Sequence, residues 1–176
     1  MTLLLPAAQL AARRAAVAGG LAPLARSLPA DLARLADGTL ELPRLKARMT
    51  RAGGRCPADG SLLEFDPWSP HEHHCARCGA AYRGEAHDRW WIMGYQLWLA
   101  ERAVHAAALH LLTGDAGTGH LAATILDRCA SAYLSYPNSD NVLGPSRPFF
   151  STYLESIWLL QLCIALDLHE AARGVS

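Results

Sequence analysis

The stretch WWIMGYQLWLAERAVHAAALHLL, residues 90–112, decides the fold class of this chain. It contains no proline, and large side chains such as Trp91, Tyr95 and Trp98 recur at intervals of three and four residues, which is the period of one helix face. Gly114 ends the pattern, as glycine often does just after the last turn of a helix. The spacing therefore predicts one long helix over residues 90–112.

Two more helices are expected after it. The second covers about residues 118–136 and ends at Pro137, which cannot continue a helix. The third begins at Thr152-Tyr-Leu-Glu155, a T-x-x-E pattern that predicts a capping box, and continues to about His169. Three helices of this length with connections of differing length predict a mostly α fold of antiparallel helical hairpins.

The third helix has an unusual composition. Residues 157–168 include ten apolar side chains and cover nearly the whole circumference of the helix. A helix that is apolar all round must be enclosed by neighbours. We therefore expect partners for the helix over residues 152–169, either a second copy in a homo-oligomer or further helices of a longer protein.

The residues before the long helices divide into two segments. Residues 1–52 are rich in Ala, Leu and Arg and are broken by prolines and a Gly pair, so they predict short helices. Residues 53–88 contain closely spaced Gly and Pro and the apolar run LLEF at 62–65, which predicts a small β-hairpin. We therefore expect three regions, 1–52, 53–88 and 89–176, of which the second is too poor in apolar residues to be stable without a staple.

We expect a bound metal ion to supply this additional cross-link between distant parts of the segment. Cys75 and Cys78 form a C-x-x-C-G knuckle, and Cys56 precedes a tight turn of its own. Thiolates with one imidazole at such spacing suit a structural, tetrahedral Zn²⁺. Four histidines could supply the fourth ligand: His71, His73, His74 and His87. We expect His73, with His74 as the second choice, and we read the site as Cys56, His73, Cys75 and Cys78.

The sequence of these three cysteines also permits other functions. A redox C-x-x-C would need a helix N-terminus in a βαβ setting, which nothing here predicts. A disulfide from Cys56 to one knuckle cysteine and a site that no longer binds metal are the remaining alternatives. Cys129 and Cys163 lie on predicted helices and are interpreted as small buried hydrophobes.

A polar loop of about twelve residues joins the second and third helices. Loops of this length usually serve a purpose, although Asn and Asp also stabilise turns through their own backbone. Asn141 and Arg147 lie near the start of the third helix, where they could donate hydrogen bonds to an anionic ligand, and Tyr153 lies just beyond. These three residues are the candidate substrate-binding residues.

Charge and composition exclude some classes of protein. Sixteen basic and sixteen acidic residues give no net charge, and apolar types make up 51% of the chain. Such a chain is neither a disordered polar segment nor a nucleic-acid binder driven by bulk charge. We find no signal peptide or membrane-spanning stretch in the sequence, so a cytoplasmic location without membrane contact is the default expectation.

Several motifs together resemble the N-terminal part of heparinase II/III-like proteins. They are CP-x-DG at 56–60, FDPWSP at 65–70, H-x-C-x-x-CG at 73–79, LWLAER at 97–102, YPN-x-DNVLGPSR at 136–147 and YLESIW at 153–158. The resemblance covers about residues 40–170. It implies an incomplete (α/α) toroid of helical hairpins, with a zinc-ribbon-like insertion, that is followed in the family by more toroid and a β-sandwich domain.

The resemblance also implies a chemistry. Heparinase II/III-like enzymes are polysaccharide lyases that cleave uronic-acid polysaccharides by β-elimination, in which a donor neutralises the uronate and a base removes the C5 proton. No segment of this chain matches the family's catalytic positions, so the catalytic residues are unknown and the chain alone is expected to be inactive. An acidic polysaccharide is the implied partner, with Asn141, Arg147 and Tyr153 lining the cleft. The alternative is a non-catalytic, zinc-stapled helical module that binds a protein or a glycan.

Overall fold

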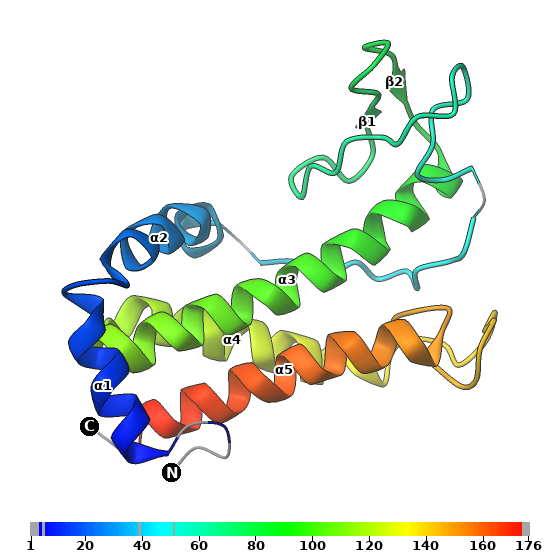
Figure 1. Cartoon of the computed structure of the whole chain (residues 1–176). Helices are drawn as coiled ribbons and strands as arrows, with labels where there is room; N and C mark the ends of the chain where they lie inside the picture. The colour runs from blue at the N-terminus through cyan, green and yellow to red at the C-terminus, as the bar shows by residue number, and fades with distance from the viewer. Residues whose placement is uncertain (1–3, 5, 39, 51, 174–176) are drawn as a thin grey trace. The chain divides into compact units, whose positions relative to one another are not determined.

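The computed structural model describes residues 4, 6–38, 40–50 and 52–173, and these residues form a mostly helical protein (Figure 1). The elements within that part of the chain are α1 (Ala7–Val17), α2 (Ala22–Asp37), β1 (His73–His74), β2 (Ala81–Tyr82), α3 (Glu85–Thr113), α4 (Ala116–Tyr133) and α5 (Thr152–Arg173). The two strands pair antiparallel, with His73 opposite Tyr82 and His74 opposite Ala81. The expectation of a mostly α fold is thus confirmed.

The observed helix α3 begins earlier than the sequence pattern predicts. Its first turn lies at Glu85, five residues before Trp90, and the amides of His87 and Asp88 both donate to the carbonyl of Gly84. Acidic side chains at Glu85 and Asp88 favour a helix N-terminus because they face the positive end of the helix dipole. The apolar period therefore located the body of the helix and missed its polar first turn.

The chain forms two compact units, each built from separate stretches of sequence. Unit 1 comprises Met1–Glu41, Leu99–Ser131 and Leu159–Ser176, and unit 2 comprises Leu42–Trp98 and Ala132–Trp158. Helices α3 and α5 each contribute residues to both units. The division into the expected regions 1–52, 53–88 and 89–176 stays a prediction.

Unit 1 contains α1, α2, most of α4 and the C-terminal parts of α3 and α5. Its buried residues come from all of these helices, and alanines of α3 such as Ala103 and Ala106 are fully inaccessible to solvent. The Arg14 side chain of α1 donates to the carbonyl of Leu111 in α3 at 2.9 Å. A Cβ atom at Gly119 of α4 would lie 2.8 Å from the His110 ring, so α3 and α4 approach closely there.

Unit 2 contains the N-terminal part of α3, the β1–β2 hairpin and the loop between α4 and α5. Figure 1 shows the hairpin beyond the N-terminal end of α3. Phe65 packs against Gly94 so closely that a Cβ atom there would lie 2.9 Å from the ring. The Trp91 indole donates to the carbonyl of Asp66 at 2.6 Å. The segment before the hairpin is thereby fixed on α3.

The start of α5 differs from the expected capping box. The hydroxyl of Ser151 accepts the Tyr153 amide at 3.2 Å, while Thr152 donates to the carbonyl of Pro145. The capping-box prediction is therefore wrong. The Glu155 carboxylate accepts its hydrogen bonds from Arg147 and Tyr133, and the side chain that caps the helix is that of Ser151.

Within the part of the chain that the structure describes, one side of α5 is buried. Trp158, Leu162, Ala165 and Leu168 are all less than 9% exposed. Leu159, Leu160 and Leu166 on the other side are 50% exposed or more, and Cys163 between them is exposed, contrary to its interpretation as a core residue. A partner that covers this face, whether a second copy or further toroid helices, stays a prediction.

None of the helices described is both long enough and apolar enough to cross a lipid bilayer.

Candidate metal centre

Two short segments of unit 2 adopt the same turn. The first is Cys56-Pro-Ala-Asp-Gly60 and the second is Cys75-Ala-Arg-Cys-Gly79. In each, the amide of the glycine donates to the carbonyl of the leading cysteine at 2.9 Å. Both glycines have a positive φ, 72° and 73°, a conformation that favours glycine. The two segments therefore adopt equivalent turns, with Asp59 before the glycine in the first and Cys78 before the glycine in the second.

A second pair of hydrogen bonds continues this equivalence. The amide of Cys56 donates to the carbonyl of Ser61 at 2.8 Å, and the amide of Cys75 donates to the carbonyl of Ala80 at 3.0 Å. Each cysteine thus sits at the start of a turn that closes five residues later. Leu63 forms a bridge with Cys75 and lies in a small buried cluster with both cysteines, which brings the two turns together.

The two turns point four potential metal ligands at one another. One ligand atom from each of Cys56, Asp59, Cys75 and Cys78 lies within 4.8 Å of the others. The sulfur atoms of Cys56 and Cys78 are 3.7 Å apart, and all five cysteines of the chain are free thiols. Cys56 and Cys75 are buried, whereas Asp59 and Cys78 are exposed. This arrangement could hold one metal ion.

Ser61 positions the carboxylate in this group. Its amide and its hydroxyl both donate to one oxygen of Asp59, at 2.9 and 2.5 Å. The same hydroxyl lies 3.1 Å from the sulfur of Cys75. Hydrogen bonds from Ser61 lower the pKa of Asp59 to about 2 and, together with the Cys78 amide, lower the pKa of the Cys75 thiol to about 7. Both groups are thereby biased toward the anionic forms that bind metals.

The surroundings of the group complete its hydrogen bonding. The Tyr82 hydroxyl lies 3.1 Å from the sulfur of Cys56, and this contact raises the pKa of Tyr82. Tyr82 and Trp90 pack against Cys56, Leu63 and Cys75. By contrast, burial alone raises the pKa of Cys129, in α4, to about 12, as expected of an inert core thiol. The four-residue group is chemically distinct from the other cysteines.

The structure brings together three of the four expected ligands and places the fourth elsewhere. His73 is 1% exposed, and its Nε2 atom lies 2.9 Å from a carboxylate oxygen of Asp88 in the first turn of α3. Asp59 instead lies with the three cysteines. The reason is geometric, because the residue three positions after Cys56 turns back toward the cysteine, while the His73 side chain leaves strand β1 toward α3.

The other histidines also have different partners. The second carboxylate oxygen of Asp88 lies 3.0 Å from Nδ1 of His71, so this aspartate bridges two histidines. His74 contacts Glu72, and His87 contacts the carbonyl of Gly53. In the part of the chain that the structure describes, these histidines therefore attach the hairpin to α3 or to itself and take no part in the four-residue group.

Lys46 organises the loop that joins α4 and α5. It is only 3% exposed, and its ammonium lies 2.6 Å from the side-chain oxygen of Asn141. It also donates to the carbonyls of Ser139 and Ser146 at 2.7 and 2.8 Å, with a longer contact to that of Pro137. Burial lowers the pKa of this amine. Because the Lys46 ammonium is hydrogen-bonded to several oxygens of the loop, it fixes the shape of the loop.

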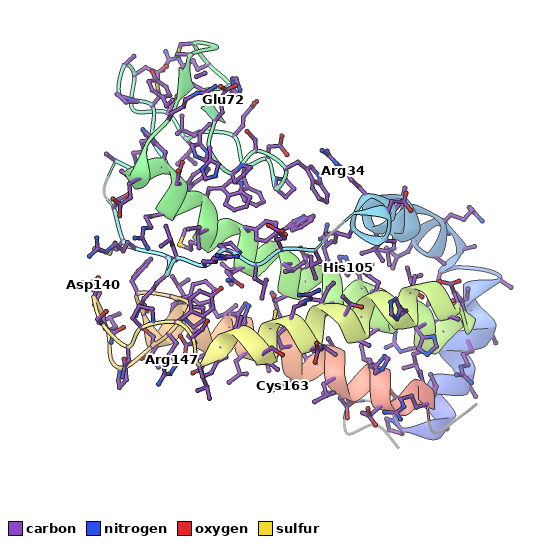
Figure 2. The ribbon with its side chains drawn as sticks, turned by 180° about the vertical axis from the view of Figure 1, so that it is seen from behind. Arg34, Glu72, His105, Asp140, Arg147 and Cys163 are labelled. Carbon is purple, nitrogen blue, oxygen red and sulfur yellow. The ribbon has the colours of Figure 1, made fainter. Side chains whose placement is uncertain are left out.

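The three expected substrate-binding residues lie around this loop in different roles. Asn141 accepts from Lys46 and from the Ser146 hydroxyl, and it donates to Asn138. Arg147 donates to the carbonyls of Leu134 and Tyr136, and Figure 2 shows it on the same loop as Asp140. Tyr153 is 68% exposed. Asn141 and Arg147 are thus hydrogen-bonded within the protein itself, although Asn141 is exposed and Arg147 is half-buried, whereas Tyr153 is the most open of the three to solvent.

Two important residues were missed at the sequence level, although signals for both were present. Asp59 stands three residues after Cys56 and just before Gly60, which matches the spacing of Cys78 and Gly79. Lys46 is the only lysine among sixteen basic residues. A lone lysine in an arginine-rich chain indicates a place where a compact ammonium is needed.

Comparison with protein-family models, with curated proteins and with solved structures gives no match to this chain.

Proposed function

We propose that this chain is a non-catalytic helical module whose hairpin is stapled by one structural Zn²⁺ ion. The observation that carries the proposal is the convergence of Cys56, Asp59, Cys75 and Cys78 from two equivalent turns. The hairpin and its flanking turns form a zinc-ribbon-like unit on the N-terminal end of α3. Binding of a protein or a glycan is the role that we propose for the module.

The donor set and its dimensions support zinc. Three thiolates and one carboxylate are ligands that Zn²⁺ accepts in tetrahedral sites, and soft sulfur disfavours Mg²⁺ and Ca²⁺. A tetrahedron with Zn–S bonds of ~2.3 Å has edges of about 3.8 Å. The measured distance between the sulfurs of Cys56 and Cys78, 3.7 Å, agrees with such an edge. The sulfur of Cys75 lies 3.9 Å from the nearer carboxylate oxygen of Asp59.

The arrangement supports a structural role for the metal. Four protein ligands fill a tetrahedral shell and leave no position for substrate or water. The two strands of the hairpin are only two residues long, and the buried apolar side chains around the site are few. A segment of this kind gains little from burial of apolar surface, so bound metal would supply much of its stability.

Elemental analysis tests the proposal directly. We expect about one Zn per chain in protein purified without chelators, and a loss of most of this metal in the double variant Cys75→Ser/Cys78→Ser. Cys163→Ser is the matched control, because it removes an exposed free thiol outside the group and should leave the zinc content unchanged. A zinc content near zero in the unaltered protein, or an equal loss in the control, would contradict the proposal.

The series of motifs favours a second proposal, that the chain is the N-terminal part of a heparinase II/III-like polysaccharide lyase with an (α/α) toroid. The motif YPN-x-DNVLGPSR supports it, and in this chain Asn141 and Arg147 of that motif are engaged within the loop. β-Elimination would then depend on other residues. The ultraviolet absorbance of the unsaturated product distinguishes the two proposals: sustained turnover of a uronate polymer by this chain would exclude a non-catalytic module.

A further inference from the structure

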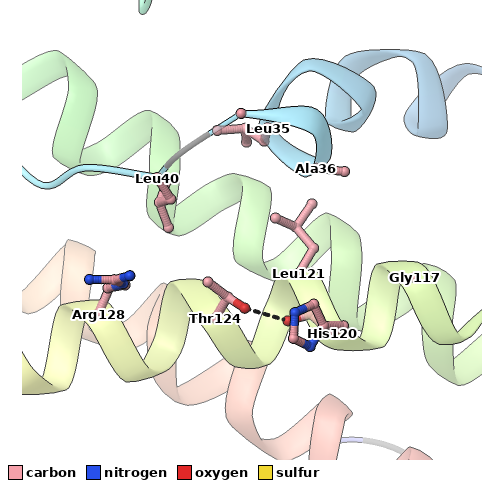
Figure 3. Close-up of a pocket in the computed structure, with 9 residues that line it drawn as sticks. Leu35, Ala36, Leu40, Gly117, His120, Leu121, Thr124 and Arg128 are labelled. Atoms are coloured by element: carbon pink, nitrogen blue, oxygen red, sulfur yellow. Dashed lines mark hydrogen bonds between the residues drawn. The ribbon is translucent and has the colours of Figure 1, made fainter.

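A cavity of about 360 Å³ lies in unit 1, between the C-terminal end of α2 and one face of α4 (Figure 3). This volume falls in the range of sites that bind small molecules. Nine residues line the cavity: Leu35, Ala36, Gly38, Leu40, Gly117, His120, Leu121, Thr124 and Arg128. It is separate from the candidate metal centre, whose residues all belong to unit 2.

The cavity has an apolar wall. Leu35, Leu40 and Leu121 are each less than 9% exposed, so their side chains are held firmly by the rest of unit 1. Figure 3 shows Leu40 and Leu121 extending into the space between α2 and α4. Ala36 lies at the exposed rim and leaves the cavity open beside it. An aliphatic group placed here would leave water on contact with three leucines.

One edge of the cavity carries positive charge without a counter-ion. His120, Thr124 and Arg128 follow one another at intervals of four residues, so they share a single face of α4. Within the described part of the chain, the Arg128 guanidinium makes no ion pair and no hydrogen bond, even to its neighbour Asp127. The Thr124 hydroxyl donates to the His120 carbonyl at 2.9 Å, so this hydroxyl is already engaged within α4 (Figure 3).

We infer that this cavity binds a small organic monoanion, a carboxylate on an aliphatic body. The guanidinium of Arg128 would take the carboxylate, because its planar donors match two carboxylate oxygens. The aliphatic body would lie against Leu40, Leu121 and Leu35. A single free guanidinium beside a mostly apolar wall fits one negative charge and an apolar tail, in contrast to a polyanion, which would need several cations.

Calorimetric titration with octanoate and with 1-octanol tests this inference, because the two compounds share an aliphatic chain and differ in charge. We expect one octanoate site per chain and weaker binding of octanol. Arg128→Gln should weaken octanoate binding by about tenfold and leave octanol unaffected, as for the loss of one charge-assisted hydrogen-bond pair. Arg13→Gln, at another exposed arginine of unit 1, is the matched control and should change neither.

A second variant tests the cavity without removing a buried side chain. Ala36→Trp adds bulk at the exposed rim and should weaken both compounds at least about fivefold, since it fills the aliphatic part of the site. Helical circular dichroism and zinc content check that each variant is folded. Octanoate binding that is absent, that survives both Arg128→Gln and Ala36→Trp, or that falls equally in Arg13→Gln would overturn the inference.

Discussion

Two irregular segments of unit 2 are each organised around a group of inward-facing polar atoms, and they differ in where the positive charge comes from. In the α4–α5 loop the charge belongs to the chain, as the ammonium of Lys46 surrounded by oxygens. In the hairpin segment three thiols and a carboxylate converge with no basic side chain among them. With the zinc site that we propose, the hairpin would take its cation from outside, while the loop already carries its own.

The ligand atoms in the two segments fit this difference. Carbonyl and amide oxygens are neutral acceptors, and they suit an ammonium that forms three hydrogen bonds. Thiolates and a carboxylate carry negative charge and suit a divalent ion. We therefore expect the loop to keep its structure in the presence of a chelator, and the hairpin to lose its structure when metal is removed.

Metal removal should produce the largest effect. A chelator in excess should unfold the segment of residues 52–84 while the α4–α5 loop keeps its structure, because structural zinc contributes roughly 10 kcal/mol of apparent binding energy in small domains. Amide hydrogen exchange measured by residue separates the two segments. Equal protection of the hairpin with and without metal would contradict the proposed dependence of the hairpin on zinc.

Replacement of Lys46 by Met should come next. The variant leaves the oxygens of Ser139, Asn141 and Ser146 without their charged donor, and we expect a loss of about 3 kcal/mol in the free energy of unfolding. Denaturant unfolding of the zinc-loaded protein measures it. Lys46→Arg tests the geometry, since a planar guanidinium does not fit a cage built for a compact ammonium and should restore less than half of the loss.

Replacement of Asp59 should have a smaller effect, one confined to the metal. Asp59→Asn removes the negative charge but keeps the shape, and zinc affinity should fall by at least about tenfold, the lower end for loss of a residue that supports a metal site. Asp59→Cys should restore or exceed the original affinity, because it gives both turns the same C-x-x-C-G pattern of ligands. Competition with a colorimetric chelator gives the affinities, and tighter zinc binding by Asp59→Asn would refute the role of Asp59.

The smallest effect is expected at the surface of the α4–α5 loop. Arg48 pairs with Asp140 at 2.6 Å, and both side chains are about half exposed. Because exposed ion pairs contribute little, Arg48→Gln should cost about 0.5 kcal/mol or less in the same unfolding experiment. A loss as large as that in Lys46→Met would mean that the loop is held from its surface and not by the buried ammonium.

The helical part of the fold could be predicted from periodicity because long amphipathic helices leave a strong pattern. The pattern missed the polar first turn of α3, and it gave no indication that α3 and α5 each contribute to two units. These features depend on contacts between segments that are distant in the sequence, and the apolar pattern of one helix contains no information about such contacts.

Three of the four expected ligands, Cys56, Cys75 and Cys78, lie in one group that could hold a metal ion. The fourth, His73, lies outside this group and Asp59 lies in it, because a turn and a strand decide which of the two side chains is directed toward the cysteines, and a sequence pattern does not show this. The roles of Asn141 and Arg147 could not be predicted either. The sequence alone does not distinguish loop side chains that face a ligand from loop side chains that hydrogen-bond to their own backbone.

The unequal burial of the four ligands has a consequence for kinetics. Cys56 and Cys75 lie beneath the surface, while Asp59 and Cys78 are open to solvent on the outer side. In the zinc site that we propose, a competing chelator would approach through Asp59 and Cys78 while the inner pair stays bound, so metal exchange would require no prior opening of the hairpin. The ion would then pass between this protein and other carriers at a rate set by ligand substitution, and the stability of the hairpin would follow the free zinc concentration around it.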